Sequence, residues 1–318
     1  AEEAMEETLQ MLGIYEEMAR DVAAIPVIPG EKSERERFAG AERTYTIEAM
    51  MGNQWALQSG TSHFLGQNFS KQFDIKFLDE HNNQQFAHTT SWGVSTRMVG
   101  AVIMTHGDDK GLRLPPKLAP IQAVIVPIWR KEKEKAEVFE QAEQAFAQLK
   151  EAGIRVHLDQ RDHLTPGFKY NDWEMRGVPL RIEIGPRDVA KRCVVVARRH
   201  LPGKEGKVFD VSMDNLSTQI EAFLDEVQKG LYQQALDFRE HNTHSNIENY
   251  ATFKRVAEEQ GGFLKVHWAG STMDEEKIQE ELRITHRCFP AGAQDGPEGR
   301  CFYTGKPTQQ VAIFARAY

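Results

Sequence analysis

Residues 91–100 read SWGVSTRMVG and residues 105–112 read THGDDKGL, and this stretch decides the fold. Small residues precede Arg97, which opens an apolar run from Met98 to Met104. A run that is apolar almost all round predicts a buried helix. Burying a guanidinium is costly unless an anion pairs with it. The planar guanidinium can pair with two phosphate oxygens at once, so the stretch predicts a nucleotide site at Arg97. The alternative is a surface arginine on an amphipathic helix.

The same stretch resembles motif 3 of a class II aminoacyl-tRNA synthetase, specifically a prolyl-tRNA synthetase of the archaeal and eukaryotic-like type. Residues 56–69, ALQSGTSHFLGQNF, are similar to the active-site strand of that family, and residues 159–188 are similar to its anticodon-binding domain. The resemblance covers essentially the whole chain. It implies an α+β and α/β multidomain fold: part of an antiparallel-sheet catalytic domain, an α/β anticodon-binding domain and a small α/β C-terminal domain.

Composition bounds the possible partners. A chain of 318 residues predicts two or three domains. The net charge of -8 gives no global basic field for nucleic acid, so DNA is not expected and RNA contact needs a local patch. A charge cluster of this kind is more often a solvated face than a binding site. The candidate patch consists of Arg187, Lys191, Arg192, Arg198, Arg199, Lys204 and Lys207.

Apolar runs and cysteine usage indicate the compartment. No run approaches the roughly twenty apolar residues that span a bilayer, and the N-terminal segment is acidic, unlike a signal peptide. The three cysteines, Cys193, Cys288 and Cys301, fit a reducing compartment better than a disulfide framework. We therefore expect a cytoplasmic protein with no membrane contact.

Hydrophobic periodicity predicts the first domain, residues 1–118. Apolar spacing predicts a helix over 2–23, and the prolines and charges of 26–38 predict a mobile lid-like loop. Alternation over 43–77 and 86–90 predicts one antiparallel sheet, closed by the Arg97 helix. A proline-rich joint at 115–120 ends the domain.

Two further domains follow. Residues 119–228 alternate strands at 122–128, 154–158, 179–184 and 193–197 with helices at 132–149 and from about 214, which predicts an α/β domain. Residues 229–318 form the third domain and end in a strand-like run at 310–318.

Polar residues on the predicted strand at 56–69 are the candidate substrate contacts. Spacing alone favours ordinary polar positions on a half-exposed sheet. The resemblance implies that Gln58 and Thr61 contact the ATP side and that His63 lies near the proline pocket. It also implies that Phe38 and Trp92 are aromatic residues of that pocket, although lone aromatics are usually core. Gly93 would let the backbone approach the ligand.

Arg97 would stabilise the charge on the polyphosphate as the proline carboxylate attacks, so its catalytic contribution is electrostatic. The chemistry implies ATP as a substrate and Mg²⁺, for which Glu48 is a weak candidate ligand. In the segment 159–188, bases would be read by carboxylates, basic residues and stacking. The resemblance implies Arg161, Lys169, Glu174 and Arg181 as tRNA anticodon contacts; an exposed salt-bridge network would use the same residue types.

The chain departs from the family pattern at the zinc site. The four cysteine positions of that pattern hold Ala269, Asp274, Cys301 and Thr304 here, and these do not make a closed tetrahedral site. We therefore predict no zinc and no other protein-bound metal, with Cys288 buried and off the pattern. The terminal Tyr318 also matches the family, whose last carboxylate is thought to fold back towards the catalytic domain; the alternative is a plain final strand.

Motifs 1 and 2 of the family would lie upstream of Ala1. A sheet without their strands would expose edges, so either the chain is part of a longer one or the strands come from elsewhere. The resemblance implies ATP-dependent activation of proline and its transfer to tRNA(Pro) in a homodimer. The alternatives are a non-catalytic tRNA-binding or regulatory relative and a nucleotide sensor without RNA.

Overall fold

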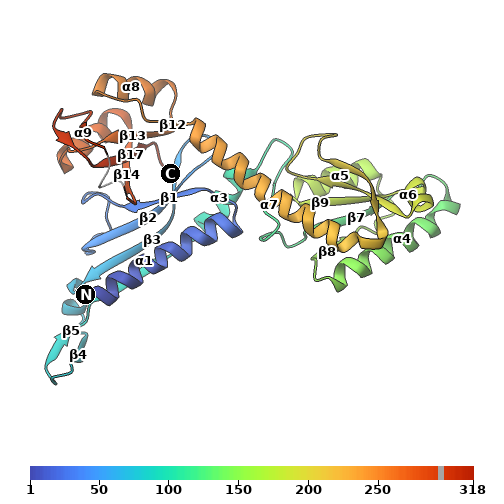
Figure 1. The fold of residues 1–318 in the computed structure, drawn as a ribbon, viewed down its shortest axis with the longest axis horizontal. Coiled ribbons are helices and arrows are strands. Elements are labelled where there is room, and N and C mark those ends of the chain that lie inside the picture. Colours follow the sequence, from blue (N-terminus) through green and yellow to red (C-terminus); the bar gives the residue numbers. More distant parts are fainter. Residues whose placement is uncertain (293–296) are drawn as a thin grey trace. The chain divides into compact units, whose positions relative to one another are not determined.

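The structure is a computed structural model that describes residues 1–292 and 297–318 (Figure 1). The chain forms two compact units. The first consists of Ala1–Asp21, Ile25–Thr105 and Ala235–Tyr318, and the second of Val22–Ala24 and His106–Gln234. Each unit is built around its own sheet.

An eight-stranded sheet forms the centre of the first unit, in the order β12-β13-β17-β14-β1-β2-β3-β6. Neighbouring strands are antiparallel except β12 and β13. The strands are β1 (Val27–Glu31), β2 (Arg43–Met50), β3 (Ala56–Gly66), β6 (Thr89–Gly93), β12 (Thr243–His244), β13 (Phe263–His267), β14 (Thr285–Pro290) and β17 (Val311–Ala315). Antiparallel pairing was expected here and is confirmed.

Helices cover this sheet at both ends of its strand order. Helix α1 (Glu2–Glu17), followed by a π-helical turn at Met18–Val22, packs on β2, β3 and β6, and Ser62 Oγ donates to the carbonyl of Thr8 at 2.7 Å. Helices α8 (Tyr250–Glu259) and α9 (Thr272–Leu282) share an apolar core with β13 and β17. The apolar spacing thus predicted α1 correctly.

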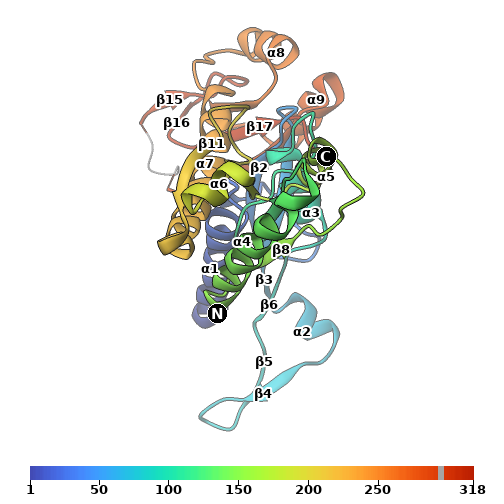
Figure 2. The ribbon, with the colours of Figure 1, turned by 90° about the vertical axis from the view of Figure 1, so that its right-hand side faces the viewer.

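Two local expectations for the first unit were wrong. Residues 27–31 are strand β1, paired on both edges, rather than part of a mobile loop. Phe73 lies outside the main sheet, beyond helix α2 (Asn68–Gln72), and Phe77 lies in a separate hairpin of β4 (Lys76–Leu78) and β5 (Gln84–Phe86). Figure 2 shows this hairpin extending away from the sheet, and Phe77 within it is 50% exposed.

The three expected domains do not coincide one to one with the two compact units. Strand β14 belongs to the segment 229–318, yet it pairs with β1, placing Pro290 opposite Gly30. A Cβ at Gly30 would lie 2.4 Å from the carbonyl oxygen of Phe289, so glycine permits this close approach. Most of the segments 1–118 and 229–318, namely residues 1–21, 25–105 and 235–318, therefore share one compact unit and its sheet.

The second unit has a five-stranded sheet in the order β11-β10-β9-β7-β8. Strands β8 and β9 run parallel to β7, whereas β10 pairs antiparallel with β9, and the edge strand β11 pairs antiparallel with β10. The strands are β7 (Ala123–Pro127), β8 (Val156–Leu158), β9 (Leu180–Ile184), β10 (Cys193–Arg198) and β11 (Lys207–Ser212). The helices are α4 (Glu132–Glu151), α5 (Pro166–Met175), α6 (Pro186–Lys191) and α7 (Leu216–His241), which ends in the first unit; a 3₁₀ turn at Met213–Asn215 precedes α7.

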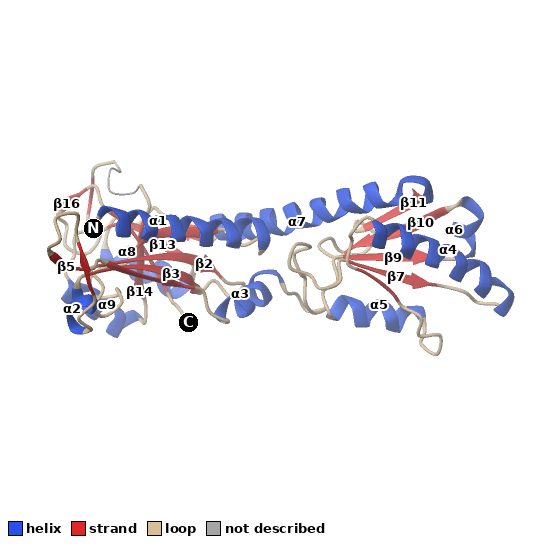
Figure 3. Cartoon of the chain, turned by 90° about the horizontal axis from the view of Figure 1, so that it is seen from below, coloured by secondary structure: helices blue, strands red, loops and turns tan. Residues whose placement is uncertain are grey.

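Both faces of this second sheet are buried (Figure 3). Ala123 and Ile125 point into a core with α4 and α7, whereas Val124 and Val126 pack on Trp173 of α5. Alternate residues of β7 thus serve opposite faces, which accounts for the continuous apolar run. The expected α/β character is confirmed. No described helix has the length and apolar character that a membrane span requires.

Candidate functional site

Strand β3 presents polar residues to one face through an irregularity in its pairing with β2. Glu48 pairs with Gln58 and Ile47 pairs with Gly60, so Ser59 has no opposite residue. Such a bulge resets the alternation of side chains, which explains how Gln58 shares a face with Thr61 despite an odd spacing. On the other edge of β3, Gly93 pairs with Thr61.

One cavity of about 390 Å³ lies over this face of the first unit. The residues around it come from β3, from β6 and from the turn that enters helix α3 (Arg97–His106). They include these sequence-predicted residues: Gln58, Thr61, His63, Trp92, Gly93 and Arg97. The fold therefore brings the predicted ATP and proline contacts together.

Phe38 is held beside this cavity by Thr44. The Phe38 ring lies 5.0 Å from the His63 ring between centroids. The main-chain N–H of Phe38 donates to Thr44 Oγ1 at 3.0 Å, and a second 3.0 Å hydrogen bond joins Thr44 Oγ1 to His63 Nδ1. Burial lowers the pKa of His63, which favours a neutral imidazole. Sequence reasoning missed Thr44, because nothing in its local pattern distinguishes it from other strand threonines.

Arg97 is exposed, and our expectation of a buried guanidinium was wrong. Helix α3 buries Ala101 and Val102 but leaves Val99 63% exposed, so the helix is not apolar-buried all round. Arg97 Nη1 donates to the main-chain oxygen of Gln58 at 3.1 Å. This bond holds one nitrogen of the guanidinium beside Gln58, a predicted ATP contact.

Glu48 is not placed to bind magnesium. Its carboxylate is fully buried and accepts hydrogen bonds from Thr46 Oγ1 at 2.9 Å and from Arg287 Nη2 at 2.9 Å, and Lys32 Nζ lies 3.3 Å away. These partners already satisfy and neutralise it. The weak expectation of a magnesium ligand at Glu48 is therefore contradicted.

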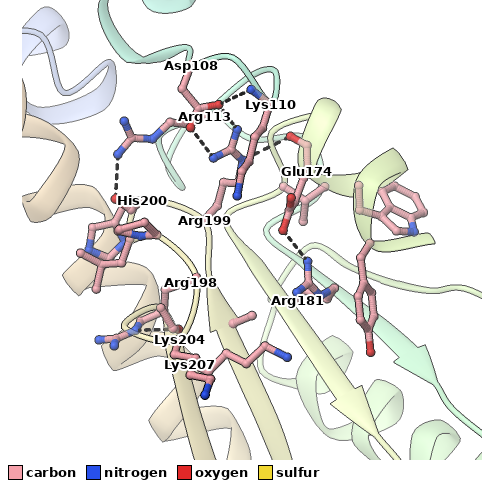
Figure 4. A pocket seen from close by; sticks show the side chains of 18 of the residues that line it. Asp108, Lys110, Arg113, Glu174, Arg181, Arg198, Arg199, His200, Lys204 and Lys207 are labelled. Atoms are coloured by element: carbon pink, nitrogen blue, oxygen red, sulfur yellow. Dashed lines mark hydrogen bonds and ion pairs between the residues drawn. The ribbon is translucent and has the colours of Figure 1, made fainter. Parts of the chain in front are cut away.

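The second unit contains a basic cavity of about 630 Å³ (Figure 4). Glu174 and Arg181 line it, and Arg181 Nη1 donates to Glu174 Oε1 at 3.0 Å. The Arg181 guanidinium lies 4.0 Å from the centroid of the Tyr170 ring. At the other end, Arg199 pairs with Asp108 at 2.6 Å. A cavity that combines guanidinium groups, a carboxylate and an aromatic ring suits a polyanion that carries bases.

Some residues of this cavity were missed by sequence reasoning. Tyr170 lies one helical turn before Glu174 on α5, so their four-residue spacing could have revealed a shared face. Lys110 and Arg113 lie outside the predicted anticodon-binding segment, and no sequence signal linked them to it. Of the basic patch, the cavity is lined by Arg198, Arg199, Lys204 and Lys207. Lys191 and Arg192 instead pair with Asp210 and Asp214.

Arg161 and Lys169 lie in a separate network around Asp159. Arg161 Nη2 bonds to Asp159 Oδ2 at 2.7 Å, and Trp173 Nε1 donates to the same oxygen at 2.8 Å. Lys169 is 1% exposed, and its ammonium lies 3.7 Å from Asp159 Oδ1. An ammonium enclosed in this way cannot reach an RNA phosphate, so a direct anticodon contact by Lys169 is contradicted.

The positions of the family's zinc cysteines have other partners. Asp274 caps helix α9, since its carboxylate accepts from the N–H and hydroxyl of Ser271 at 2.8 Å. Cys301 is buried and accepts from the N–H of Thr304 at 3.4 Å. Within residues 1–292 and 297–318, no cluster of three His, Cys, Asp or Glu side chains is arranged to hold a metal.

The terminal Tyr318 lies beside the beginning of β3. Its N–H donates to the carbonyl of Ala56 at 3.2 Å, its hydroxyl accepts from Asn53 at 2.8 Å, and its ring lies 5.1 Å from that of Trp55 between centroids. The end of the chain is thus fastened to the strand that carries the candidate substrate contacts.

Two family models match parts of the chain. The model described as "Anticodon binding domain" matches residues 122–223, and the model described as "Prolyl-tRNA synthetase, C-terminal" matches residues 250–318. The first match contains Glu174 and Arg181, and the second contains helix α9.

Named relatives cover the whole chain. The chain is 53% identical over 317 residues to "Proline--tRNA ligase" of Chloroflexus aggregans, covering 99% of this chain and 65% of that protein. It is 52% identical to "Proline--tRNA ligase, chloroplastic/mitochondrial" of Arabidopsis thaliana, covering 100% of this chain and 58% of that protein. The chain therefore spans less than two thirds of the length of these curated relatives.

Solved structures agree with these matches. A prolyl-tRNA synthetase of Cryptosporidium parvum, complexed with L-proline and AMP, superposes with a TM-score of 0.93 at 37% identity. That match covers 100% of this chain and 67% of the other. The same enzyme complexed with halofuginone and AMPPNP gives a TM-score of 0.94 at 36% identity, covering 100% and 66%.

Proposed function

The chain belongs to the prolyl-tRNA synthetase family, as its sequence predicts, and we propose that the protein is a proline--tRNA ligase. Such an enzyme activates proline with ATP and transfers it to tRNA(Pro). One observation carries the proposal: a single cavity collects Gln58, Thr61, His63, Trp92, Gly93 and Arg97. A relative with the same fold is complexed with proline and AMP.

In the first step, a carboxylate oxygen of proline attacks the α-phosphorus of ATP and pyrophosphate leaves with the electrons of the broken P–O bond. Arg97 lines the cavity and stabilises the charge on the polyphosphate, so its role is electrostatic. Gln58 and Thr61 hold the nucleotide side. In the second step, a ribose hydroxyl of the tRNA 3' end attacks the proline carbonyl, and AMP leaves.

The proline pocket is formed on the His63 side of the cavity. Phe38 and Trp92 supply aromatic surface for a compact ring, and Gly93 leaves room for the ligand. The neutral imidazole of His63 adds a polar contact without a second positive charge beside the proline ammonium. Proline binding thus depends on shape and on the placement of Phe38.

Magnesium is proposed to enter as part of the substrate. No carboxylate is among the described residues that line the cavity, and Glu48 is fully engaged by Arg287 and Lys32. Mg²⁺ is often held chiefly by substrate phosphates and water. We therefore assign it to the phosphates of ATP and to no side chain of this chain.

The basic cavity of the second unit is the proposed anticodon site. The Glu174 carboxylate can accept from a guanine edge, and Arg181, fixed against Tyr170, can contact a phosphate or stack on a base. Arg161 remains a candidate at the rim of the Asp159 network, whereas Lys169 supports it from inside. tRNA(Pro) is the proposed partner.

Assembly, compartment and zinc complete the proposal. We expect a homodimer, which light scattering on the purified protein would show. The expected compartment is the cytoplasm; the chloroplastic/mitochondrial name of the Arabidopsis relative makes an organelle the alternative.

We also propose that Cys301 binds no zinc, because Asp274 serves as a helix cap. One zinc per chain by elemental analysis would overturn this last assignment.

Proline-dependent exchange of pyrophosphate into ATP tests the function. Since the relatives are longer than this chain, the assay uses the full-length protein, with cysteine and alanine as comparison substrates. We expect exchange with proline. Its absence, with retained binding of tRNA(Pro), would instead establish a non-catalytic tRNA-binding relative.

A further inference from the structure

We propose that Glu275 is a positioning residue for the substrate site, because it holds, through Ser33, the loop that carries Phe38. The inference rests on the proposed function for its kinetic consequence and on the geometry of the first unit for its structural one. It assigns helix α9, far along the chain, a part in proline binding.

A buried hydrogen bond joins the loop to the helix. Ser33 Oγ donates to Glu275 Oε2 at 2.7 Å across 242 positions of sequence, and the two residues are 5% and 6% exposed. A hydrogen bond to a buried carboxylate is stronger than a neutral one, and leaving either partner unpaired there is costly. The loop is therefore fixed to α9 at Ser33.

Ser33 is also the base of the turn that leads to Phe38. Its carbonyl accepts from the N–H of Glu36 at 3.1 Å and of Arg37 at 3.0 Å. The next residue, Phe38, donates its N–H to Thr44 Oγ1 and places its ring 5.0 Å from that of His63. A chain of contacts thus runs from Glu275 through Ser33 and the turn to the proline side of the cavity.

A second contact makes the attachment more than a single bond. Arg35 Nη2 donates to Gln279 Oε1 at 2.7 Å, and its Nη1 lies 3.5 Å from Glu276. Gln279 lies four residues after Glu275 and so on the same face of α9. Helix α9 therefore contacts both Ser33 and Arg35, which lie at the two ends of the stretch 33–35 that begins the turn.

The position of Glu275 is unusual for a residue with a purely helical role. Helix α9 is already capped by Ser271 and Asp274, and Ile278 and Leu282 anchor it to the core. Burial raises the pKa of the Glu275 carboxyl, and the hydrogen bond from Ser33 opposes this shift. The bond from Ser33 is the largest effect that opposes burial, and a weaker hydrogen bond from Trp268, in the core beneath α9, acts in the same direction.

Hydrogen–deuterium exchange on the ligand-free protein tests the attachment without any activity. In Glu275→Ala we expect faster exchange in the peptide that covers residues 34–42, with β2 unchanged. Ser33→Ala should also speed exchange in this peptide, and the double variant should add nothing to Glu275→Ala, because that variant already removes the bond between Ser33 and Glu275. Glu275→Gln should restore slow exchange, since its amide oxygen can accept from Ser33. Glu280→Ala, an exposed glutamate of α9, is the matched control.

Kinetics of proline-dependent exchange test the consequence. We expect Glu275→Ala to raise KM for proline by roughly fivefold or more, with KM for ATP and kcat nearly unchanged, a coupling of ordinary size between sites. Glu275→Gln should retain the wild-type KM. A loss of general stability would instead lower the amount of active enzyme and move both KM values little.

The outcomes separate the two proposals. Unchanged loop exchange in Glu275→Ala would overturn the positioning role, and so would faster loop exchange with an unaltered KM for proline. A failure of Glu275→Gln to rescue would show that the charge on α9, and not the bond to Ser33, matters, and would overturn it too. If the wild-type protein shows no activity, the proposed function fails, and with it the kinetic role; deuterium exchange then still decides whether Glu275 holds the loop.

Discussion

Arg97 and Gln58 meet at the edge of the candidate substrate cavity: Arg97 Nη1 donates to the Gln58 carbonyl at 3.1 Å and lies 3.4 Å from its Oε1. The other guanidinium nitrogens of Arg97 have no hydrogen-bond partner within the described parts of the chain. One edge of the guanidinium is thus fixed by the protein, and the rest is available to an anion.

This geometry predicts that Arg97→Ala lowers the rate of proline-dependent ATP–pyrophosphate exchange by about 10²–10³-fold, as expected when a preorganised donor to a developing charge is removed. Arg97→Lys should recover only part of the rate, because an ammonium keeps the charge but lacks the planar guanidinium that pairs with two oxygens at once. Affinity for tRNA(Pro) should stay unchanged in both. Arg255→Ala, at an exposed position on α8, serves as the control. A full-rate Arg97→Ala enzyme would remove Arg97 from the mechanism.

The basic cavity of the second unit predicts a salt-dependent contribution from Lys204. This residue lines the cavity, is exposed and has no ion-pair partner among the described residues. Lys204→Ala should weaken tRNA binding and reduce the slope of log K against log salt by about 1, as for one phosphate contact. Titrations at several salt concentrations measure the slope, with Lys133→Ala on α4 as the matched control. Equal slopes for the two variants would place the RNA elsewhere.

The sequence placed most residues of the candidate substrate cavity together, because they lie close to one another along the chain. Gln58, Thr61 and His63 come from one strand, and Arg97 follows the neighbouring strand β6, so the motif spacing already places them together. The bulge at Ser59 could not be derived from alternation, which puts Gln58 on the wrong face. The resemblance to a family supplied what periodicity could not.

Burial and long-range pairing were beyond the sequence argument. Lys169 has the residue type of an RNA contact, and only the fold reveals that Asp159 encloses it. Similarly, β14 pairs with β1 across more than half of the chain, and no local pattern encodes such a register. Local motifs therefore placed the candidate residues side by side, whereas the contacts that support them lie far apart in the sequence.

The Asp159 network predicts a large stability effect in the second unit. Asp159→Ala leaves the buried Lys169 ammonium without its carboxylate, which should cost about 3–5 kcal/mol of unfolding free energy. Urea unfolding of the transition that reports this unit measures it. Asp162→Ala, at an exposed aspartate nearby, should cost far less. A small effect of Asp159→Ala would mean that Lys169 reaches water by rearrangement.

The Asp159 carboxylate also predicts that the stability of the second unit falls at acid pH. Burial alone would raise the pKa of Asp159, but hydrogen bonds from Arg161 and Trp173 outweigh it and hold the pKa below its ordinary value. Because the folded pKa is lowered, the stabilisation is fully present above the unfolded pKa of about 3.9 and is lost as the pH falls from there towards the folded pKa. In Asp159→Asn the second unit should lose less stability between pH 5 and pH 3 than the wild type, a range set by the unfolded pKa of about 3.9. Equal acid profiles would contradict the assignment.

Variants of Glu48 test whether its buried carboxylate stabilises the fold or binds magnesium. Glu48→Ala should destabilise the first unit by about 3–5 kcal/mol, because Arg287 and Lys32 would remain buried together without a counter-charge. Glu17→Ala, at an exposed site on α1, should change little. Glu48→Gln keeps the shape of the side chain, and its dependence of pyrophosphate exchange on Mg²⁺ concentration should match that of the wild type. A weakened response to Mg²⁺ in a folded Glu48→Gln protein would return Glu48 to the list of ligands, whereas an unchanged response assigns its carboxylate to the core that joins β2 to β14.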